Sequence, residues 1–313
     1  MPDCDTKIDL VDMIQQAVSM IPEGQVSTYG DIAKALGDVR AARAVGGVLS
    51  NLDDSVKIPT HRVVYSTGEV GQRNNLEFRN ILRSEGVPFS DKRVRLNAAR
   101  FVNFDIEPIL IRLREEQKNI AGRVILDDDP GDPDNIAGLD VSYQEDDAFA
   151  AICIMDRRTG NFIEEKTHRC DVKFPYIPTY LTYRELPALA PLLEDIPDTI
   201  YMMDGHGVLH PRGAGIACQI GVMMGIPIIG AAKALLVGEV DNMEAEQSAI
   251  RMNGSIMGCM LRQGRKAAFV SPGNRTSLSR AVKLCSETLN KGIPAPLKRA
   301  HDLANKVRRE AYS

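Results

Sequence analysis

The feature that most constrains the fold is a run of three strand-like segments in the middle of the chain. The first two segments are rich in apolar residues, and only a few residues separate each segment from the next. The segments are Ile136–Tyr143, Ala148–Met155 and Asn161–His168. Strands joined by such short connections pair as neighbours in one sheet. The run therefore predicts a three-stranded meander.

Beyond the meander, strand-like and helix-like segments alternate. Strands are expected at Thr199–Met203, Pro227–Ala231, Ser255–Arg262 and Lys266–Ser271, and helices from about Thr182 and over Arg212–Met224, Ser277–Asn290 and Leu297–Tyr312. A meander followed by strand–helix units is typical of an α/β domain of the ribonuclease-H-like kind. We expect that fold for the larger part of the chain.

The N-terminal third has helical periodicity instead. Helices are expected over residues 8–20, from Thr28 to Leu36, over Val39–Leu49 and over Phe78–Ser84, with a small β-wing at Val63–Val70. Thr28 followed by Asp31 is a capping-box pattern, and Asp38 is a cap for the next helix. This order predicts a small, mainly α, winged helix-turn-helix domain.

The two patterns imply two domains, as a length of 313 residues also favours. Residues 87–104 contain proline and several Lys and Arg and have no clear period. We place the junction there, which gives domains at residues 1–103 and 104–313. A helix expected at Glu107–Ile120 links the domains or opens the second one.

Composition limits the classes of function. No apolar run approaches the roughly 20 residues of a membrane span, and the first residues lack a signal-peptide pattern. Six cysteines are scattered without paired spacing, so we expect a cytoplasmic protein with no membrane partner. The net charge of −4 argues mildly against nucleic acid, but a metal-dependent nuclease needs carboxylates that a cation neutralises.

Four short motifs follow one another in residues 21–87. They are Ile21-Pro-Glu-Gly-Gln-Val-Ser-Thr-Tyr-Gly30, Arg43-Ala-Val-Gly46, Pro59-Thr-His-Arg-Val63 and Ser84-Glu-Gly-Val87. In this order they resemble the O6-alkylguanine-DNA alkyltransferases, and most closely the alkyltransferase-like proteins that lack the active-site cysteine. Thr60 stands where the family has that cysteine. A threonine hydroxyl at neutral pH is a poor nucleophile, so we expect no suicide alkyl transfer.

The resemblance implies a base-flipping reader of damaged double-stranded DNA that carries O6-alkylguanine. Tyr29 would rotate the phosphate of the flipped nucleotide, and Arg43 would fill the gap left in the duplex. Thr60 would line the lesion pocket, and Arg73 would lie beside the alkylated base. Small residues of the recognition helix would allow close approach to the minor groove.

Three acidic residues in the second domain lie where strands end or helices begin. Asp140 lies inside an apolar strand, Glu185 lies early in a helix, and Asp204 follows an apolar strand. A buried aspartate is costly unless it is paired or binds a metal. Carboxylates without a cluster of Cys or His suit Mg²⁺ or Mn²⁺, and such ions catalyse phosphodiester hydrolysis.

At these residues the chain resembles endonuclease V over roughly residues 106–310. The anchors are Asp140-Val-Ser-Tyr, Pro175-Tyr-Ile-Pro178, Arg184-Glu185, Asp204-Gly-x-Gly with His210-Pro-Arg, Ala232-Lys233 and Val270-Ser-Pro-Gly. The resemblance implies that Asp140 and Asp204 hold the metal and that Glu185 assists the metal and water. Lys233 would offset charge on the phosphate, and His210 would contact the site or the scissile strand.

The same resemblance implies how the lesion is recognised. Pro175, Tyr176, Ile177 and Pro178 would form a stiff wedge tipped with Tyr176 and Ile177, and the flipped base would lie near Leu181 and Gly205. Two positions depart from the family pattern. Asn274 follows Ser-Pro-Gly where His or Asp is usual, so a weaker metal ligand is expected there. Thr179 follows the wedge where Gly is usual.

The expected function is a DNA-repair endonuclease that nicks DNA at deoxyinosine, at the second phosphodiester on the 3′ side of the lesion, fused to a reader of O6-alkylguanine. One alternative is a non-catalytic protein that binds damaged DNA and recruits other repair proteins. Another is a nuclease that acts on inosine in RNA.

Overall fold

The computed structural model describes residues 8–53, 55–71, 75–127, 131–193 and 196–313. By its internal contacts the chain divides into two compact units. The N-terminal unit is Lys7–Arg114 with Lys173–Pro178, and the C-terminal unit contains Glu115–Val172 and Thr179–Ser313. The division falls inside helix α6 (Ile109–Ala121), and the domain boundary expected at residue 103 stays a prediction.

The N-terminal unit is built mainly from short helices. Its elements are α1 (Leu10–Ser19), β1 (Ser27–Thr28), α2 (Tyr29–Ala35), η1 (Val39–Ala41), α3 (Ala42–Ser50), η2 (Thr60–Arg62), β2 (Val63–Val64), α4 (Asn75–Ser84), β3 (Phe89–Ser90), β4 (Arg93–Val94) and α5 (Leu96–Ala99). The capping box expected at the start of α2 forms, because Thr28 accepts from the Asp31 N–H and Asp31 accepts from the Thr28 N–H. This reciprocal pair satisfies two backbone donors at the helix start.

Two expectations for this unit are wrong in detail. The helix expected over Val39–Leu49 is split, because the Asp38 carboxylate caps a 3₁₀ turn at Arg40 before α3 begins. The β-wing is reduced to the two-residue strand β2, which pairs in parallel with β1, and to one bridge between Val64 and Val70.

The C-terminal unit contains a mixed sheet with helices on both faces. Its strands are β5 (Asn135–Gln144), β6 (Asp147–Asp156), β7 (Phe162–Asp171), β8 (Thr199–Met203), β9 (Ile228–Ala232), β10 (Glu239–Val240), β11 (Gln247–Met252), β12 (Ser255–Gln263), β13 (Lys266–Asn274), β14 (Leu289–Asn290) and β15 (Ile293–Pro294). Its helices are α7 (Leu181–Leu189), η3 (Ala190–Leu192), α8 (Ile216–Met224), α9 (Leu278–Thr288) and α10 (Ala295–Ala311).

Among the described residues, nine strands join one sheet in the order β10-β11-β12-β13-β9-β8-β5-β6-β7. The expected meander forms β5, β6 and β7, which pair as antiparallel neighbours. Strand β8 pairs in parallel with both β5 and β9. The parallel centre brings the carboxyl ends of β5 and β8 to the same edge of the sheet.

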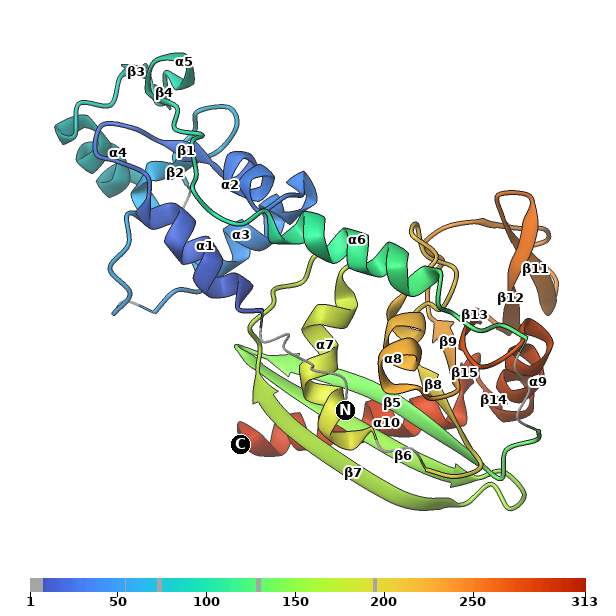
Figure 1. Cartoon of the computed structure of the whole chain (residues 1–313). Coiled ribbons are helices and arrows are strands. Elements are labelled where there is room, and N and C mark those ends of the chain that lie inside the picture. Colours follow the sequence, from blue (N-terminus) through green and yellow to red (C-terminus); the bar gives the residue numbers. More distant parts are fainter. Residues whose placement is uncertain (1–7, 54, 72–74, 128–130, 194–195) are drawn as a thin grey trace. The chain divides into compact units, whose positions relative to one another are not determined.

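Each face of the sheet carries its own apolar core. One core combines Leu139 and Met203 with residues of α7 and α8. The other combines Ile136 and Met202 with residues of α9 and α10. Figure 1 shows α7 and α8 on one side of the sheet and α10 on the other. Because successive side chains of a strand alternate between faces, Asp140 and Asp204 fall on the α10 face.

Within the parts of the chain that the structure describes, no helix combines the length and the apolar character needed to cross a membrane.

Candidate functional site

Asp140 and Asp204 lie at the same level on neighbouring strands. The register of the parallel pair sets Leu139 opposite Met203. The next residue on each side is an aspartate: Asp140 lies in the middle of β5, and Asp204 directly follows β8. Adjacent strands are about 4.8 Å apart, which brings the two side chains close together on one face. Asp140 is only 8% exposed. Residues far apart in the sequence therefore form one acidic pair.

Helix α10 adds a histidine to this pair. A Cβ atom at Gly138 would lie 2.2 Å from the backbone of Pro296, so the missing side chain allows the start of α10 to approach β5 closely. His301, two turns along α10, then lies with its Nδ1 2.6 Å from Oδ2 of Asp140. Asn305 completes the arrangement, because its amide nitrogen lies 3.0 Å from Nε2 of His301.

The hydrogen-bond network assigns the histidine tautomer. Asn305 Oδ1 accepts from the Ser142 hydroxyl, which leaves its Nδ2 as the donor toward Nε2 of His301. Nε2 is then unprotonated, and the Nδ1–H donates to Asp140. Sequence reasoning missed His301. The available signal was its place on an amphipathic helix, between Ala300 and Ala304, which are both fully buried.

Glu185 reaches the same edge from α7. It is 8% exposed. Burial raises the pKa of its carboxyl well above the ordinary value, and the charges of Asp140 and Asp204 raise it further. The hydroxyl of Tyr143 and the charge of Arg184 act in the opposite direction. The three predicted carboxylates are therefore close enough to repel one another.

Asp140 shows the same repulsion. Burial and then the charge of Asp204 raise its pKa, against opposing contributions from His301 and Lys233. Lys233, which directly follows β9, forms an ion pair with Asp204. Partial burial lowers the pKa of Lys233, but the carboxylates of Asp204 and Asp140 outweigh this and raise it. The site therefore holds more buried negative charge than its own cations compensate.

These carboxylates fit a hard divalent cation. In the described residues no three His, Cys, Asp or Glu side chains form a ready-made cage for an ion. Mg²⁺ does not require one, because it is usually held by one or two carboxylates and keeps several waters. Oδ1 of Asp140 and Oδ1 of Asp204 make no hydrogen bond to any described residue. Oxygen ligands with uncompensated negative charge are what Mg²⁺ or Mn²⁺ prefers.

The loop after Asp204 runs tightly over the sheet. A Cβ atom at Gly205 would lie 2.4 Å from a methyl carbon of Ile216. Leu181, the first residue of α7, is half-buried against the core that includes Ile216. His210 is 3% exposed, and its Nδ1 accepts a hydrogen bond from the backbone N–H of Arg212. The roles expected for Gly205, Leu181 and His210 stay predictions.

The wedge residues differ in exposure. Tyr176 is 61% exposed, whereas Ile177 is 1% exposed. Tyr176 is therefore at the surface, whereas Ile177 is buried in this structure. Pro175 is half-buried and Pro178 is exposed. Whether the segment acts as a wedge stays a prediction.

Thr179 takes a conformation that favours glycine. Its φ is +73°, and a β-branched residue pays a steric penalty in this left-handed region. Arg212 holds the position, since one guanidinium nitrogen donates to both the carbonyl and the hydroxyl of Thr179 at 2.7 Å. Gln117 also donates to the Thr179 carbonyl at 2.9 Å. The departure from Gly is thus compensated by side-chain hydrogen bonds.

Asn274 has a structural role instead of a place in the acidic site. It is 3% exposed, its Oδ1 accepts from the Ile125 N–H, and its Nδ2 donates to the carbonyls of Gly221 and Ile226. The amide thus ties three backbone segments together. The expectation that Asn274 is a weakened metal ligand is wrong, because both ends of the amide are used by the backbone.

In the N-terminal unit, Tyr29 lies on α2 and Arg43 lies on α3. Tyr29 opens α2 and packs against Tyr65, with ring centroids 5.4 Å apart. Burial, followed by the charge of Tyr65, raises the pKa of Tyr29. Arg43 is exposed on α3. Arg73 lies outside the described residues.

Thr60 lies at the start of η2, next to a compact charged network. His61 Nε2 is 2.9 Å from Glu85 Oε1, and Arg62 donates to both oxygens of Glu85. Burial would raise the pKa of Glu85, but the hydrogen bonds from Arg62 and His61 hold it below the ordinary value. The carboxylate is therefore fully matched by cations and donors.

Comparisons with known proteins cover both units. The family model for endonuclease V matches residues 118–302, and the model for the DNA-binding domain of 6-O-methylguanine DNA methyltransferase matches residues 9–87. A bifunctional methyltransferase/endonuclease of Picrophilus torridus is 38% identical over 305 residues, which are 96% of this chain and 98% of that protein.

Solved structures resemble the C-terminal unit. Endonuclease V of Streptomyces avermitilis is 32% identical, covers 65% of this chain and 94% of its own, and superposes with a TM-score of 0.60. Endonuclease V of Ciona intestinalis, in complex with a 24mer DNA containing an inosine followed by a ribo-adenosine, is 21% identical. It covers 66% of this chain and 100% of its own with a TM-score of 0.59, which shows the shared fold alone.

Proposed function

Because this chain belongs to the endonuclease V family, in the two-domain form that also carries an alkyltransferase-type DNA-binding domain, we propose that it is a DNA-repair endonuclease that nicks DNA at deoxyinosine. The cut falls at the second phosphodiester on the 3′ side of the lesion, as the family resemblance implies. The single observation that carries the proposal is the convergence of Asp140, Asp204 and Glu185 at one edge of the sheet.

The cofactor is Mg²⁺, with Mn²⁺ as a substitute. Asp140 and Asp204 would hold it, with Glu185 beside them. When bound, the ion supplies activation of water and stabilisation of negative charge on the phosphate. Its charge also offsets the mutual repulsion that raises the pKa values of Asp140 and Glu185.

The protein's own side chains have separate tasks at the phosphate. Lys233, already next to Asp204, places a positive charge beside the phosphoryl oxygens and offsets the charge that develops on them. His301 donates its Nδ1–H to Asp140, which fixes the carboxylate for its role. Glu185, which lies beside Asp140 and Asp204, assists the metal and the attacking water.

The N-terminal unit binds O6-alkylguanine in double-stranded DNA without removing the alkyl group. Tyr29 and Arg43 act on the flipped nucleotide, and Thr60 lines the pocket in the place of a nucleophile. Its helices and the β2 region act as a winged helix-turn-helix, and the C-terminal unit acts as a ribonuclease-H-like nuclease. The strand order β7-β6-β5-β8-β9, with β8 parallel to both neighbours, supports the second assignment.

The protein acts in the cytoplasm on damaged DNA, and other repair proteins are further partners. The match to the two-domain relative over 96% of this chain supports one polypeptide that both recognises and cuts.

The test is cleavage of end-labelled duplexes that carry deoxyinosine, O6-methylguanine or neither, with Mg²⁺, with Mn²⁺ or with chelator. We expect a single nick in the inosine strand that depends on the ion, and no nick with Asp140→Asn. A matched strand with ribonucleotides around the inosine tests the preference for DNA over RNA. Failure of the intact chain to nick the inosine duplex with either ion would refute the proposal.

A further inference from the structure

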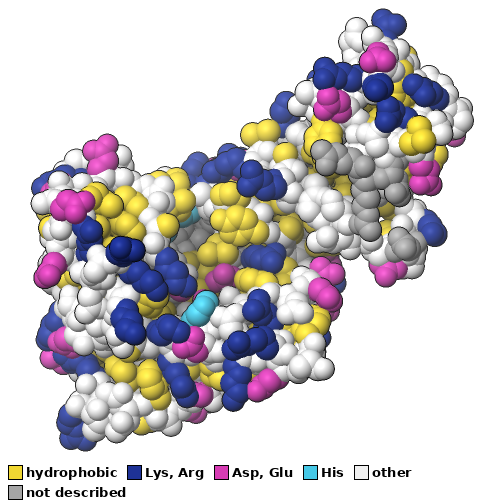
Figure 2. Space-filling view, turned by 180° about the vertical axis from the view of Figure 1, so that it is seen from behind, with side chains coloured by type: hydrophobic (Ala, Val, Ile, Leu, Met, Phe, Trp, Pro, Cys, Tyr) yellow, Lys and Arg dark blue, Asp and Glu magenta, His cyan; other side chains and the backbone are white. Residues whose placement is uncertain are grey.

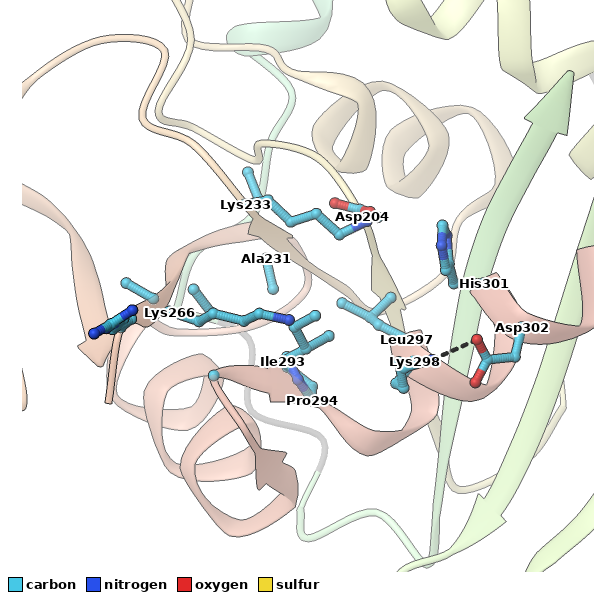
Figure 3. Close-up of a pocket in the computed structure, with 15 residues that line it drawn as sticks. Asp204, Ala231, Lys233, Lys266, Ile293, Pro294, Leu297, Lys298, His301 and Asp302 are labelled. Atoms are coloured by element: carbon cyan, nitrogen blue, oxygen red, sulfur yellow. Dashed lines mark hydrogen bonds and ion pairs between the residues drawn. The ribbon is translucent and has the colours of Figure 1, made fainter. Parts of the chain in front are cut away.

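A cavity of about 540 Å³ begins at Asp204 and His301 and leads away from the acidic site within the C-terminal unit. Figure 3 shows Lys233 and Asp204 at one side of it, His301 at another, and Ile293, Pro294 and Leu297 below. On the face seen in Figure 2, a hollow in the larger unit is bordered by several Lys and Arg side chains. None of the roles proposed above uses the part of the cavity beyond Lys233.

The cavity combines an apolar floor with a basic rim. The floor is formed by Ala231, Ile293, Pro294 and Leu297, and the rim by Lys233, Arg265, Lys266 and Lys298. Two of these cations already have carboxylate partners, since Lys233 pairs with Asp204 and Lys298 with Asp302. Arg265 and Lys266 form no ion pair with any residue that the structure describes, so the far end of the cavity has excess positive charge.

The position of Lys266 is fixed by backbone packing. A Cβ atom at Gly292 would lie 2.6 Å from the Cβ of Lys266 and 2.8 Å from its carbonyl oxygen, so only glycine allows this contact. The Gly292 N–H also donates to Oε1 of Gln263 at 3.0 Å. The β12–β13 turn is therefore held against the turn between β14 and β15, which places Lys266 beside Ile293 (Figure 3).

We propose that this cavity, which we call the strand cavity, holds a nucleotide of the cleaved strand next to the scissile phosphodiester. Lys266 and Arg265 contact its phosphate, and its sugar and base lie on the floor of Ile293, Pro294 and Leu297. The proposal rests on the proposed nuclease function. It adds a binding subsite on the cleaved strand that is separate from the lesion pocket.

Three physical arguments support a nucleotide over other ligands. The volume suits a small organic unit, because ligand pockets of proteins span about 300–1,000 Å³. Unpaired cations over an apolar floor match a phosphate joined to a sugar and base, whereas a metal ion would be repelled. The cavity opens at Lys233 and Asp204, and a strand bound at those residues must continue beyond them.

The test asks whether two losses of DNA affinity overlap: the loss on removing one nucleotide of the substrate and the loss caused by Lys266→Gln. If Lys266 contacts that nucleotide, the two losses are coupled and do not add. Inosine duplexes are shortened by one nucleotide at a time at either end of the cleaved strand. Their affinities for the full-length protein are measured in chelator, so that no reaction occurs, for wild type, Lys266→Gln and Arg265→Gln. Lys283→Gln is the matched control, because Lys283 is an exposed lysine of the same unit that pairs with Asp132 outside the cavity.

We expect wild-type affinity to fall at one step of the series, where the nucleotide of the strand cavity is removed. Lys266→Gln should show no further fall at that step, and its salt dependence of log K should be shallower by about 0.7–0.9 per lost phosphate contact. Lys283→Gln should follow wild type throughout. Unchanged melting temperatures would show that the variants are folded.

If Lys266→Gln and strand shortening lower the affinity additively at every length, the proposed role of the strand cavity is refuted. It is also refuted if a free deoxynucleoside monophosphate binds as tightly as the strand. Nicking of the full-length inosine duplex with Mg²⁺ is measured in parallel. A wild type that nicks but shows no coupling refutes this inference alone. A wild type that shows coupling but does not nick refutes the nuclease function and leaves the subsite.

Discussion

In the N-terminal unit, the carboxylate of Glu85 is matched by Arg62 and His61, whereas in the C-terminal unit the carboxylate of Glu185 is buried beside two more carboxylates. The pKa of Glu85 is lowered despite its burial, because its partners outweigh desolvation. The pKa of Glu185 is raised, because its neighbours add to desolvation. The two units thus treat buried acids in opposite ways.

This difference separates a structural network from a reactive one. Around Thr60 the charges balance within the protein, so this network needs no bound ion. Around Asp140 the charges do not balance, and like-charged groups are forced together at a cost in stability. Sites that store unfavourable charge in this way are typical of catalysis. Three substitutions and a change of pH test this difference between the two units.

The largest effect is expected from Glu185→Gln, which removes one charge from the acidic site. Nicking of the inosine duplex should fall by about 10²–10³-fold, as on loss of a single stabilising group in an active site. The melting temperature in chelator should rise, because the repulsion with Asp140 and Asp204 is reduced. Single-turnover rates and calorimetry measure the two results.

The control is Glu310→Gln at the exposed end of α10, which should change neither quantity. A decrease in both activity and melting temperature for Glu185→Gln would contradict the idea that this carboxylate is held in place against repulsion.

The equivalent change in the N-terminal unit should lower stability, where Glu185→Gln raises it. Glu85→Gln removes the partner of Arg62 and His61 and should destabilise the N-terminal unit by about 2–3 kcal/mol. Nicking at inosine should be unchanged in a duplex without alkylguanine. Hydrogen exchange of the amides of α4 and η2 measures the loss. Glu77→Gln, an exposed acid of α4, should change stability by less than about 0.5 kcal/mol.

A third change tests which contacts hold the strained backbone of Thr179, the residue that follows Pro178. Arg212→Lys keeps the charge but cannot make the paired contacts to the carbonyl and hydroxyl of Thr179. We expect a loss of about 1–2 kcal/mol in the C-terminal unit and faster hydrogen exchange around Thr179. Arg309→Lys, an exposed arginine of α10, is the matched control. Equal exchange at Thr179 in both variants would exclude a role for Arg212 in holding this conformation.

The smallest effect concerns pH, and its sign differs between the units. The folded pKa of Glu185 is raised, so folding takes up a proton, and the C-terminal unit in chelator should gain stability as pH falls from 7 toward the unfolded pKa. The gain is at most about 1.4 kcal/mol per pH unit. It should be smaller in Glu185→Gln, in which the raised pKa of Asp140 still contributes.

Between pH 7 and 3, the stability of the N-terminal unit should change only in the acid part of the range. Burial would raise the pKa of Asp31, but hydrogen bonds from Arg100 and Thr28 hold it lower, as the partners of Glu85 do for that residue. The stability that these acids contribute is complete above their unfolded pKa, about 4, and is lost as pH falls through the lower folded values. Hydrogen exchange resolved by unit between pH 7 and 3 checks both signs.

Local signals in the sequence predicted several elements well. The capping box at Thr28 and Asp31 and the strand Thr199–Met203 formed as expected, because short-range hydrogen bonds and an uninterrupted apolar run determine them. Strands β10 and β11 were missed, since their pairing depends on β12. The single helix expected over Val39–Leu49 was wrong, because the Asp38 cap also favours a tighter first turn.

At the site, residue type and motif order identified Asp140, Glu185, Asp204 and Lys233 as candidates. They did not identify His301, because a single histidine on an amphipathic helix has no distinctive spacing. They misplaced Asn274, because an amide after a strand resembles a ligand until its backbone partners are known. They also could not tell that Ile177 is buried while Tyr176 is exposed.

The sequence by itself determined the two-part organisation, the family, the meander with its strand–helix units, and the acids that converge, since these follow from periodicity and from motifs read along the chain. Only the tertiary structure decided which charges are compensated. Whether a carboxylate is stabilised by Arg62 or repelled by Asp140 depends on strand register, on the close approach of α10 at Gly138 and on burial. Electrostatic energy depends on distances and on exposure to water, and neither quantity is local in sequence.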